Sequence, residues 1–364
     1  MLLRPTPPAR SPRRRARRAA LVAVLSALAA VAATTGAPAP ARADAPAGGP
    51  VDSPFGAHSM AYLSTPLADK ERLFSQAAAM GASTIRLDMA LSAVFGSRTK
   101  PDWSKVDETV ALARKYRLRI LANVLAPPWW LPCLPGKDGS APTCGVDPRA
   151  FGLLVGALAA RTAGAVQAFE IVNEPDGRWA FSGTPEQYAH MLAASYEVVK
   201  AVAPSDQVVM GGLLGGPGNL SWLDRAFAAV PDLAAYTDAV NVHLRGPLAG
   251  VQSRLAGWRA VFASRAPGLP IWVTETGYPA DPAFQTDAGY KDGEAGQARY
   301  VSDLLSALLD GGAAKVFVTE RDNMDGPFAS EGLVADQGGA MAVRRRPAFD
   351  AFRAAATRWR LAHP

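Results

Sequence analysis

Residues 169–175 decide the fold, and they read Phe169-Glu170-Ile171-Val172-Asn173-Glu174-Pro175. The apolar run 165–172 is too short for a helix and is typical of a buried strand. Proline restricts the residue before it, so the sequence predicts an extended Glu174 whose carboxylate ends this strand. Beside the amide of Asn173, that carboxylate is a candidate catalytic group, although the three final residue types also suit a surface turn.

Residues 270–277 repeat this design about a hundred residues later, as Pro270-Ile271-Trp272-Val273-Thr274-Glu275-Thr276-Gly277. The strand-forming residues again end in a carboxylate, here Glu275. Two carboxylates at strand ends indicate two acids that face one cleft. Glycoside hydrolysis needs such a pair, because one acid protonates the leaving oxygen while the other attacks or activates water.

Strand and helix patterns alternate along the rest of the chain. The predicted strands are 53–58, 84–88, 118–124, 165–172, 207–210, 239–243, 271–274 and 315–319. The predicted helices are 67–80, 102–116, 148–162, 184–202 (with Thr184 as N-cap), 221–229, 251–264, 294–309 and 347–360. The strands are continuous apolar runs, as is typical of parallel strands with both faces buried.

Eight strand–helix pairs predict one (β/α)8 TIM barrel, in which catalytic groups lie at the C-terminal ends of the strands. Asn173, Glu174, His243 and Glu275 all follow that rule. A doubly wound sheet is the alternative, but it would need a phosphate-binding glycine pattern after its first strand. The glycine-rich residues 211–216 instead follow the fifth strand and indicate a tight strand exit.

The charge of the chain is concentrated at its N-terminus. The 364 residues, 49% of them hydrophobic, contain 38 Lys and Arg and 32 Asp and Glu. Residues 1–43 hold eight of the arginines and no acid, so 30 basic and 32 acidic residues remain in the rest of the chain. That balance gives no reason to expect nucleic acid or an anionic membrane as a partner.

The first 43 residues predict a signal peptide. An arginine cluster (13–18) precedes an apolar run (19–33), and Ala41-Arg42-Ala43 fits a cleavage site. The run is short for a membrane span, which an uncleaved anchor would need. Twin-arginine export is also compatible with the two adjacent arginines. We expect a flexible lead-in over 44–52, a catalytic domain over 53–364, and a secreted protein with no stable membrane association.

Cys133 and Cys144 are the two cysteines of the chain. Export favours a disulfide between them. A cysteine-based metal site is the alternative, but further thiols and a nearby histidine are missing from the sequence. We therefore predict no metal and no cofactor.

With the strands in this order, residues 53–360 resemble the TIM-barrel clan of retaining glycosidases, most closely the cellulase-like family 5 and the xylosidase-like family 39. The resemblance implies that Glu174, in the Asn-Glu-Pro of strand four, is the acid/base. It implies that Glu275 on strand seven is the nucleophile. Asn173 matches the asparagine that binds the substrate 2-hydroxyl.

Three further residues are candidates for the same site. Arg86 matches a strand-two arginine near the nucleophile, and His243 matches a strand-six histidine near the acid/base. His58 is a candidate because we expect it at the tip of the first strand. The alternatives are an ion pair between Arg86 and Asp88 and purely structural histidines.

Trp129, Trp130 and Trp179 lie in loops after strands three and four, on the predicted catalytic face. Aromatic faces suit the C–H faces of sugars, so we expect these residues to bind substrate. The alternative for each is packing within its loop.

The chain also departs from the pattern it resembles. Strand six reads His243-Leu244-Arg245, where the clan often has a tyrosine bonded to the nucleophile. Strand eight lacks the tryptophan usual under the sugar, and Asn123 stands where a histidine is common. These departures leave the bound sugar open.

The function predicted from the sequence is that of a secreted retaining O-glycoside hydrolase acting on a glycoside, oligosaccharide or polysaccharide. Its two carboxyls should lie about 5–5.5 Å apart. We expect the pKa of Glu174 to be raised by burial and by the charge of Glu275. The alternative is a barrel that binds carbohydrate without catalysis.

Overall fold

The structure is a computed structural model that describes residues 52–136, 141–218, 220–322, 325–335 and 344–363. Eight parallel strands form one sheet in the order β5-β4-β3-β2-β1-β8-β7-β6. The strands are β1 (Phe55–Tyr62), β2 (Thr84–Ala90), β3 (Arg119–Leu125), β4 (Val166–Ile171), β5 (Gln207–Met210), β6 (Val240–His243), β7 (Ile271–Thr276) and β8 (Ala313–Thr319).

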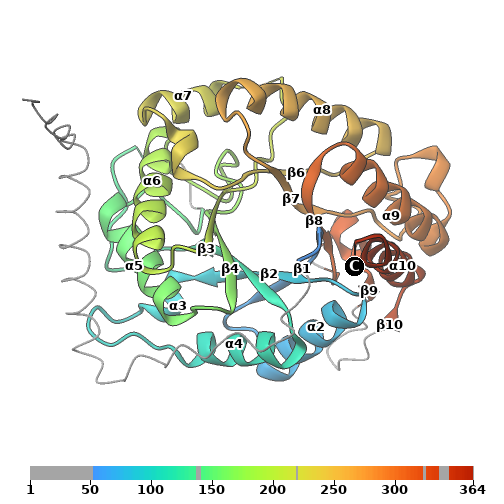
Figure 1. The fold of residues 1–364 in the computed structure, drawn as a ribbon, viewed down its shortest axis with the longest axis horizontal. Helices are drawn as coiled ribbons and strands as arrows, with labels where there is room; N and C mark the ends of the chain where they lie inside the picture. Colours follow the sequence, from blue (N-terminus) through green and yellow to red (C-terminus); the bar gives the residue numbers. More distant parts are fainter. Residues whose placement is uncertain (1–51, 137–140, 219, 323–324, 336–343, 364) are drawn as a thin grey trace, which may run out of the picture.

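An outer ring of helices surrounds these strands (Figure 1). The predicted helices are observed as α2 (Leu67–Ala79), α4 (Ser104–Tyr116), α5 (Pro148–Arg161), α6 (Pro185–Val202), α7 (Ser221–Ala229), α8 (Leu248–Arg265), α9 (Gly293–Asp310) and α10 (Pro347–Ala362). The predicted (β/α)8 TIM barrel is therefore confirmed. Short elements were not predicted: α3 (Leu91–Val94), η1 (Leu233–Tyr236), η2 (Ala288–Tyr290), η3 (Gly326–Ser330), β9 (Val334–Ala335) and β10 (Arg344–Arg345).

The barrel closes between β5 and β6, the two ends of the sheet order. The N–H of Met210 donates to the carbonyl of Ala239 (3.1 Å), and the N–H of His243 donates to the carbonyl of Leu213 (2.9 Å). Isolated bridges join Val209 to Ala239 and Leu213 to Val242. The C-terminal ends of all eight strands therefore converge on one face of a nearly closed cylinder.

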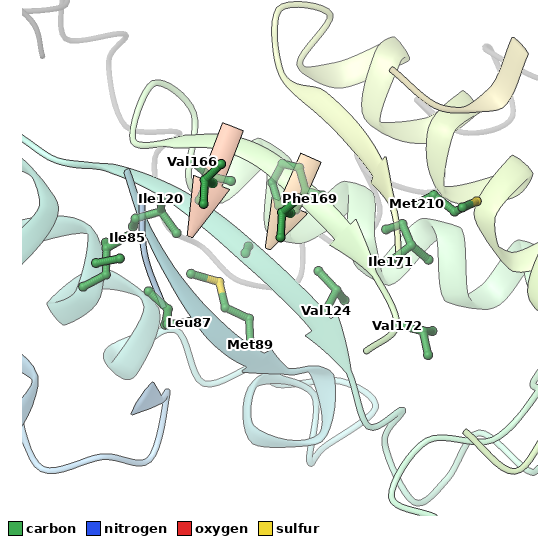
Figure 2. Packing of buried hydrophobic residues seen from close by; sticks show 14 of the residues in the cluster. Ile85, Leu87, Met89, Ile120, Val124, Val166, Phe169, Ile171, Val172 and Met210 are labelled. Carbon is green, nitrogen blue, oxygen red and sulfur yellow. The ribbon is translucent and has the colours of Figure 1, made fainter. Parts of the chain in front are cut away.

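Two apolar layers stabilise the barrel. The larger lies between sheet and helices, and Figure 2 shows its part around β2 to β5, where outward side chains such as Ile85, Ile120 and Phe169 pack together. The smaller fills the barrel interior and consists of Leu121, Ala168, Val209, Ala239, Trp272 and Phe317. The interior positions nearer the C-terminal face carry polar side chains instead, and these build the candidate site.

Local signals explain several element boundaries. Thr184 caps α6 through a capping box, since its hydroxyl accepts from the Gln187 N–H while the Gln187 side chain accepts from the Thr184 N–H.

The prediction that His58 lies at the tip of the first strand was wrong, because His58 is the fourth residue of β1. The strand continues to Tyr62 because Ala61 and Leu63 remain buried beyond it.

The structure contains the predicted disulfide between Cys133 and Cys144, with a Cα–Cα distance of 5.7 Å. The predicted signal peptide (1–43) and nearly all of the lead-in lie outside the described residues. Among the described helices, none has both the length and the apolar character needed to cross a lipid bilayer.

We predict that Cys133→Ser lowers the free energy of unfolding by about 2–3 kcal/mol, because an open loop of this length has more freedom in the unfolded chain. Urea unfolding of wild type and variant measures the difference. Thiol titration of the unreduced, unfolded wild type should find no free thiol, and two thiols per chain would contradict the pairing.

Candidate active site

Glu174 lies just beyond β4, in backbone that differs from the sequence prediction. Its φ is +42°, and that of Val172 is +65°, so both are left-handed. The prediction of an extended Glu174 was therefore wrong. The N–H of Gly177 bonds to the Glu174 carbonyl (2.8 Å), and a Cβ on Gly211 would lie 2.1 Å from the Val172 carbonyl oxygen. This turn and the close packing of Gly211 hold Glu174 in a left-handed conformation, although the proline that follows it disfavours that conformation.

Glu275 reaches the site through an irregularity in β7. Val242 of β6 pairs with Val273, but the next residue, His243, pairs with Glu275. This shift adds one residue to β7, and such bulges re-aim side chains. Glu275 is buried and lies beside the inward-facing Thr274.

Arg86 is the hub of the site, and only 1% of it is exposed. Its Nε and Nη2 donate to Glu170 (2.7 and 3.0 Å), and its Nη1 donates to Glu275 Oε1 (2.8 Å). Nη2 also donates to Asn173 Oδ1 (2.8 Å). Arg86 thus makes its ion pairs with the two glutamates and not with Asp88, so the alternative of an Arg86–Asp88 pair was wrong.

Glu170 is a site residue that the sequence analysis missed. It is fully buried as the fifth of the six residues of β4. Burial raises its pKa, but the charge of Arg86 and the nearby ring of His243, 3.9 Å away, lower the pKa to about 2. The sequence did contain a signal for Glu170, which is a single charged residue inside an apolar strand. Such a residue is almost never fully buried unless it is paired, so a buried partner could have been expected.

His243 connects the two candidate catalytic carboxylates. Its Nδ1 lies 2.7 Å from Glu174 Oε1 and 3.7 Å from Glu275 Oε2, and its Nε2 lies 3.1 Å from Thr274 Oγ1. Burial lowers its pKa, but the charge of Glu275, the Glu170 carboxylate 3.9 Å from Nε2 and the bond to Glu174 raise it to about 9. His243 is therefore an imidazolium at neutral pH and donates from both ring nitrogens.

His58 lies near Oε1 of Glu275, whereas His243 lies near Oε2. Burial is the main cause that lowers its pKa to about 3, so the ring is neutral. Arg86 Nη1 lies 3.1 Å from His58 Nδ1, and an arginine can only donate, so the His58 proton lies on Nε2. That Nε2 is 3.6 Å from Glu275 Oε1 and has no hydrogen-bond partner among the described residues, which leaves a donor beside the carboxylate.

The position of the missing tyrosine is occupied by Arg245. Its Nη1 lies 3.2 Å from Glu275 Oε2. Burial raises the pKa of Glu275, but the positive charges of His243, Arg86 and Arg245 lower it well below its usual range. Glu275 is thus held as a carboxylate.

One oxygen each of Glu174 and Glu275 and a ring nitrogen of His243 lie within 4.8 Å of one another. Such a set could hold a metal ion. In this structure, however, His243 Nδ1 lies 2.7 Å from Glu174 Oε1, which is the distance of a direct hydrogen bond. The three residues are therefore described as an acid–base cluster. The second oxygen of Glu174, Oε2, has no partner within the described part of the chain.

The three predicted tryptophans differ in their surroundings. Trp129 and Trp179, in the loops after β3 and β4, are 82% and 59% exposed. Trp130 packs against the core, and its Nε1 donates to the Phe95 carbonyl (2.7 Å). Trp129 and Trp179 are therefore free to meet a ligand, whereas Trp130 has the packing role.

Comparison with known proteins gives the class of the chain. Residues 157–310, less than half of its length, match the family model described as glycosyl hydrolase catalytic core. This segment contains Glu174, His243 and Glu275. With the barrel, it confirms the predicted resemblance to the TIM-barrel glycosidases and the prediction of an enzyme of that class. A comparison with curated proteins finds no match.

Solved structures share the fold at low sequence identity. A family 39 glycoside hydrolase from Bacteroides cellulosilyticus is 17% identical with a TM-score of 0.60, and the match covers 84% of this chain and 63% of the other. A family 39 β-xylosidase from Caulobacter crescentus is 19% identical with a TM-score of 0.65, covering 85% and 72%. A family 5 glycoside hydrolase from Bifidobacterium longum, solved with Manβ1-4GlcNAc, is 15% identical with a TM-score of 0.61, covering 84% and 79%. The chain thus spans about two thirds of the length of the family 39 proteins.

We predict that Arg86→Gln destabilises the fold by about 3–5 kcal/mol, because Glu170 would remain buried without its counter-charge. Urea unfolding measures the loss. The surface variant Arg225→Gln breaks an exposed bidentate pair with Glu186 and should cost far less stability, because solvent screens that pair. Equal losses in both variants would contradict the role of Arg86.

A second prediction concerns the pH dependence of stability. The folded-state pKa of His243, about 9, lies above the ordinary 6.5. The contribution of His243 to the free energy of unfolding is therefore fully present below pH 6.5. It is lost as the pH rises through 9, a change on the order of 3 kcal/mol. Unfolding of wild type and His243→Gln between pH 6 and 9.5 should show this loss only in the wild type. Parallel curves would contradict the raised pKa.

Proposed function

We propose that this chain is a secreted retaining O-glycoside hydrolase, with Glu174 as acid/base and Glu275 as nucleophile. The observation that carries the proposal is the asymmetry of the two carboxylates. Three cations surround Glu275 and keep it ionised. Glu174 bonds through Oε1 to one of these cations, His243, and keeps Oε2 without a partner among the described residues. A nucleophile needs a charged carboxylate, and a proton-transfer group needs an oxygen that is not already bonded.

The spacing of the carboxylates supports the retaining mechanism. One oxygen of Glu174 lies within 4.8 Å of an oxygen of Glu275. Retaining enzymes hold their carboxyls about 5–5.5 Å apart, whereas inverting enzymes leave roughly 6.5–9.5 Å for a water molecule. The separation in this site is on the short, retaining side of these two ranges, so a direct attack by Glu275 is favoured.

The reaction then follows two steps. Glu275 attacks the anomeric carbon while Glu174 gives its proton to the leaving oxygen, and a glycosyl ester forms. Glu174 next takes a proton from water, which attacks the same carbon and releases Glu275 as a carboxylate. His243 donates to Glu174 Oε1 and so fixes the orientation of the acid/base in both steps.

Asn173 and His58 supply donors for the sugar. Arg86 donates to Asn173 Oδ1, so the amide NH2 of Asn173 points elsewhere and is available for a substrate hydroxyl. His58 offers its Nε2 proton in the same way. Trp129 and Trp179 extend the site with exposed aromatic surface, which suits further sugar units.

The substrate class is a glycoside, oligosaccharide or polysaccharide. Solved structures of the same fold include proteins named as a β-xylosidase, a glucosidase and an exo-β-1,4-mannosidase. Aryl β-xylosides, glucosides and mannosides are therefore the first substrates to test. The arginine-rich leader in residues 1–43 supports secretion.

We predict that removing Glu275 and removing Glu174 affect different steps of the reaction. Wild type treated with dinitrophenyl 2-deoxy-2-fluoro glycosides should carry a covalent adduct on Glu275, found by mass spectrometry. Glu275→Ala should lose turnover of every substrate. Glu174→Ala should still be glycosylated by substrates with good leaving groups, and azide should rescue its second step as a glycosyl azide of retained configuration.

The configuration of the azide product is the internal control. Azide should enter Glu275→Ala from the opposite face and give the inverted product, because the nucleophile is gone. Swapped configurations would overturn the two roles. A wild type that binds these glycosides but forms no adduct and no product would favour the alternative, a barrel that binds carbohydrate without catalysis.

A further inference from the structure

Arg245 joins Glu275 to a third carboxylate, Glu331. Its Nη1 lies 3.2 Å from Glu275 Oε2, while its Nε and Nη2 donate to the two oxygens of Glu331 (2.8 and 3.1 Å). The guanidinium also lies over the ring of Phe328, 5.3 Å from its centre. Arg245 is thus fixed on one side by a bidentate pair and faces Glu275 with the other.

Glu331 is itself held rigidly. It is buried, and Thr319 Oγ1 donates to its Oε2 (2.8 Å). Gln297 Nε2 donates to its backbone carbonyl (3.1 Å), which ties the segment after η3 to α9. A Cβ on Gly277 would lie 2.5 Å from the Glu331 carboxyl carbon, so only glycine fits there. The carboxylate therefore positions Arg245 from a fixed point.

The two oxygens of Glu275 have different neighbours. Oε1 is held by buried Arg86 at 2.8 Å. Oε2 faces the other way and lies 3.7 Å from His243 Nδ1, which bonds to Glu174. Oε2 is therefore the oxygen on the side of the acid/base, and Arg245 is its arginine partner.

We propose that Arg245, positioned by Glu331, speeds release of the sugar from Glu275 by stabilising the negative charge that returns to Oε2. This inference rests on the proposed function. In the second step the C–Oε2 bond breaks, its electron pair goes to Oε2, and Glu174 takes the proton of the attacking water. A cation beside Oε2 stabilises the carboxylate more than the neutral ester.

The charge of Arg245 distinguishes this site from those glycosidases of the clan that have a tyrosine at this position. A tyrosine at this position would donate a hydrogen bond without carrying a formal charge, whereas Arg245 adds the Coulomb attraction of a cation to its hydrogen bond. Arg245 should therefore make the glycosyl-enzyme shorter-lived. Because Arg245 stabilises the carboxylate and not the ester, it does not help the ester to form. Replacing Arg245 should therefore slow hydrolysis of the ester more than its formation.

The test separates the two steps with 2-deoxy-2-fluoro glycosides. Arg245→Gln should slow reactivation of the trapped enzyme about tenfold or more, while the rate of trapping changes much less. Glu331→Gln should act in the same direction with a smaller effect, and Arg245→Lys should retain part of the rate. Arg225→Gln, which breaks a bidentate pair remote from the site, should match wild type in both steps.

A second readout is the acid limb of the trapping rate against pH. Arg245→Gln should move it to higher pH, because a cation that keeps Glu275 ionised is lost. The other titratable or charged groups around Glu275 remain in place: His58, Tyr62, Arg86, Asp88, Glu174 and His243.

The outcomes distinguish this proposal from the function itself. If wild type forms the adduct on Glu275 but Arg245→Gln slows trapping and reactivation equally, or changes only KM with an unmoved acid limb, the role of Arg245 is overturned. If wild type forms no adduct with any glycoside, the proposed function fails, and the role of Arg245 fails with it. Should Arg245→Gln not fold, Glu331→Gln and Arg245→Lys carry the same comparison.

Discussion

The guanidinium of Arg86 is the interaction on which the rest of the site depends. It binds Glu170, Glu275 and Asn173 and fixes the tautomer of His58. Taking such a charge out of water is costly, and only several simultaneous charge-assisted bonds offset that cost. The barrel supplies them because strands β1, β2, β4 and β7 surround one axis, so a single buried group sets the positions of four polar side chains.

Around this hub, charge is distributed unequally. Three cations surround Glu275, while Glu174 bonds to one of them, the imidazolium of His243, and keeps one oxygen without a partner in the described residues. Two chemically identical side chains are thereby given different tasks by their surroundings, which is how one fold runs acid and nucleophile chemistry together. The polar layer that achieves this lies next to the apolar interior layer around Trp272, so the floor of the site is apolar.

The strands and helices were predictable because hydrophobic runs and caps are local signals. Strand β5 and helix α7 begin and end where the sequence indicated. The tertiary details were not predictable. Glu174 departs from the backbone expected before proline because Gly211, which directly follows β5, packs against Val172. Glu331 lies 86 residues from Arg245, in a segment with no pattern that points to the site. Glu170 was overlooked because its partner, Arg86, comes from a distant strand.

The left-handed backbone of Val172 and Glu174 has a consequence for engineering the protein. A β-branched residue at φ +65° is a genuine outlier, and such conformations cost on the order of 1–3 kcal/mol each. The chain therefore gives up folding free energy at the very segment that presents its candidate acid. Glycine at position 172 would adopt this geometry freely, but it would also remove a fully buried side chain from the core, so the two effects oppose each other. A thermostable variant must therefore relieve this strain without emptying the core beneath the turn.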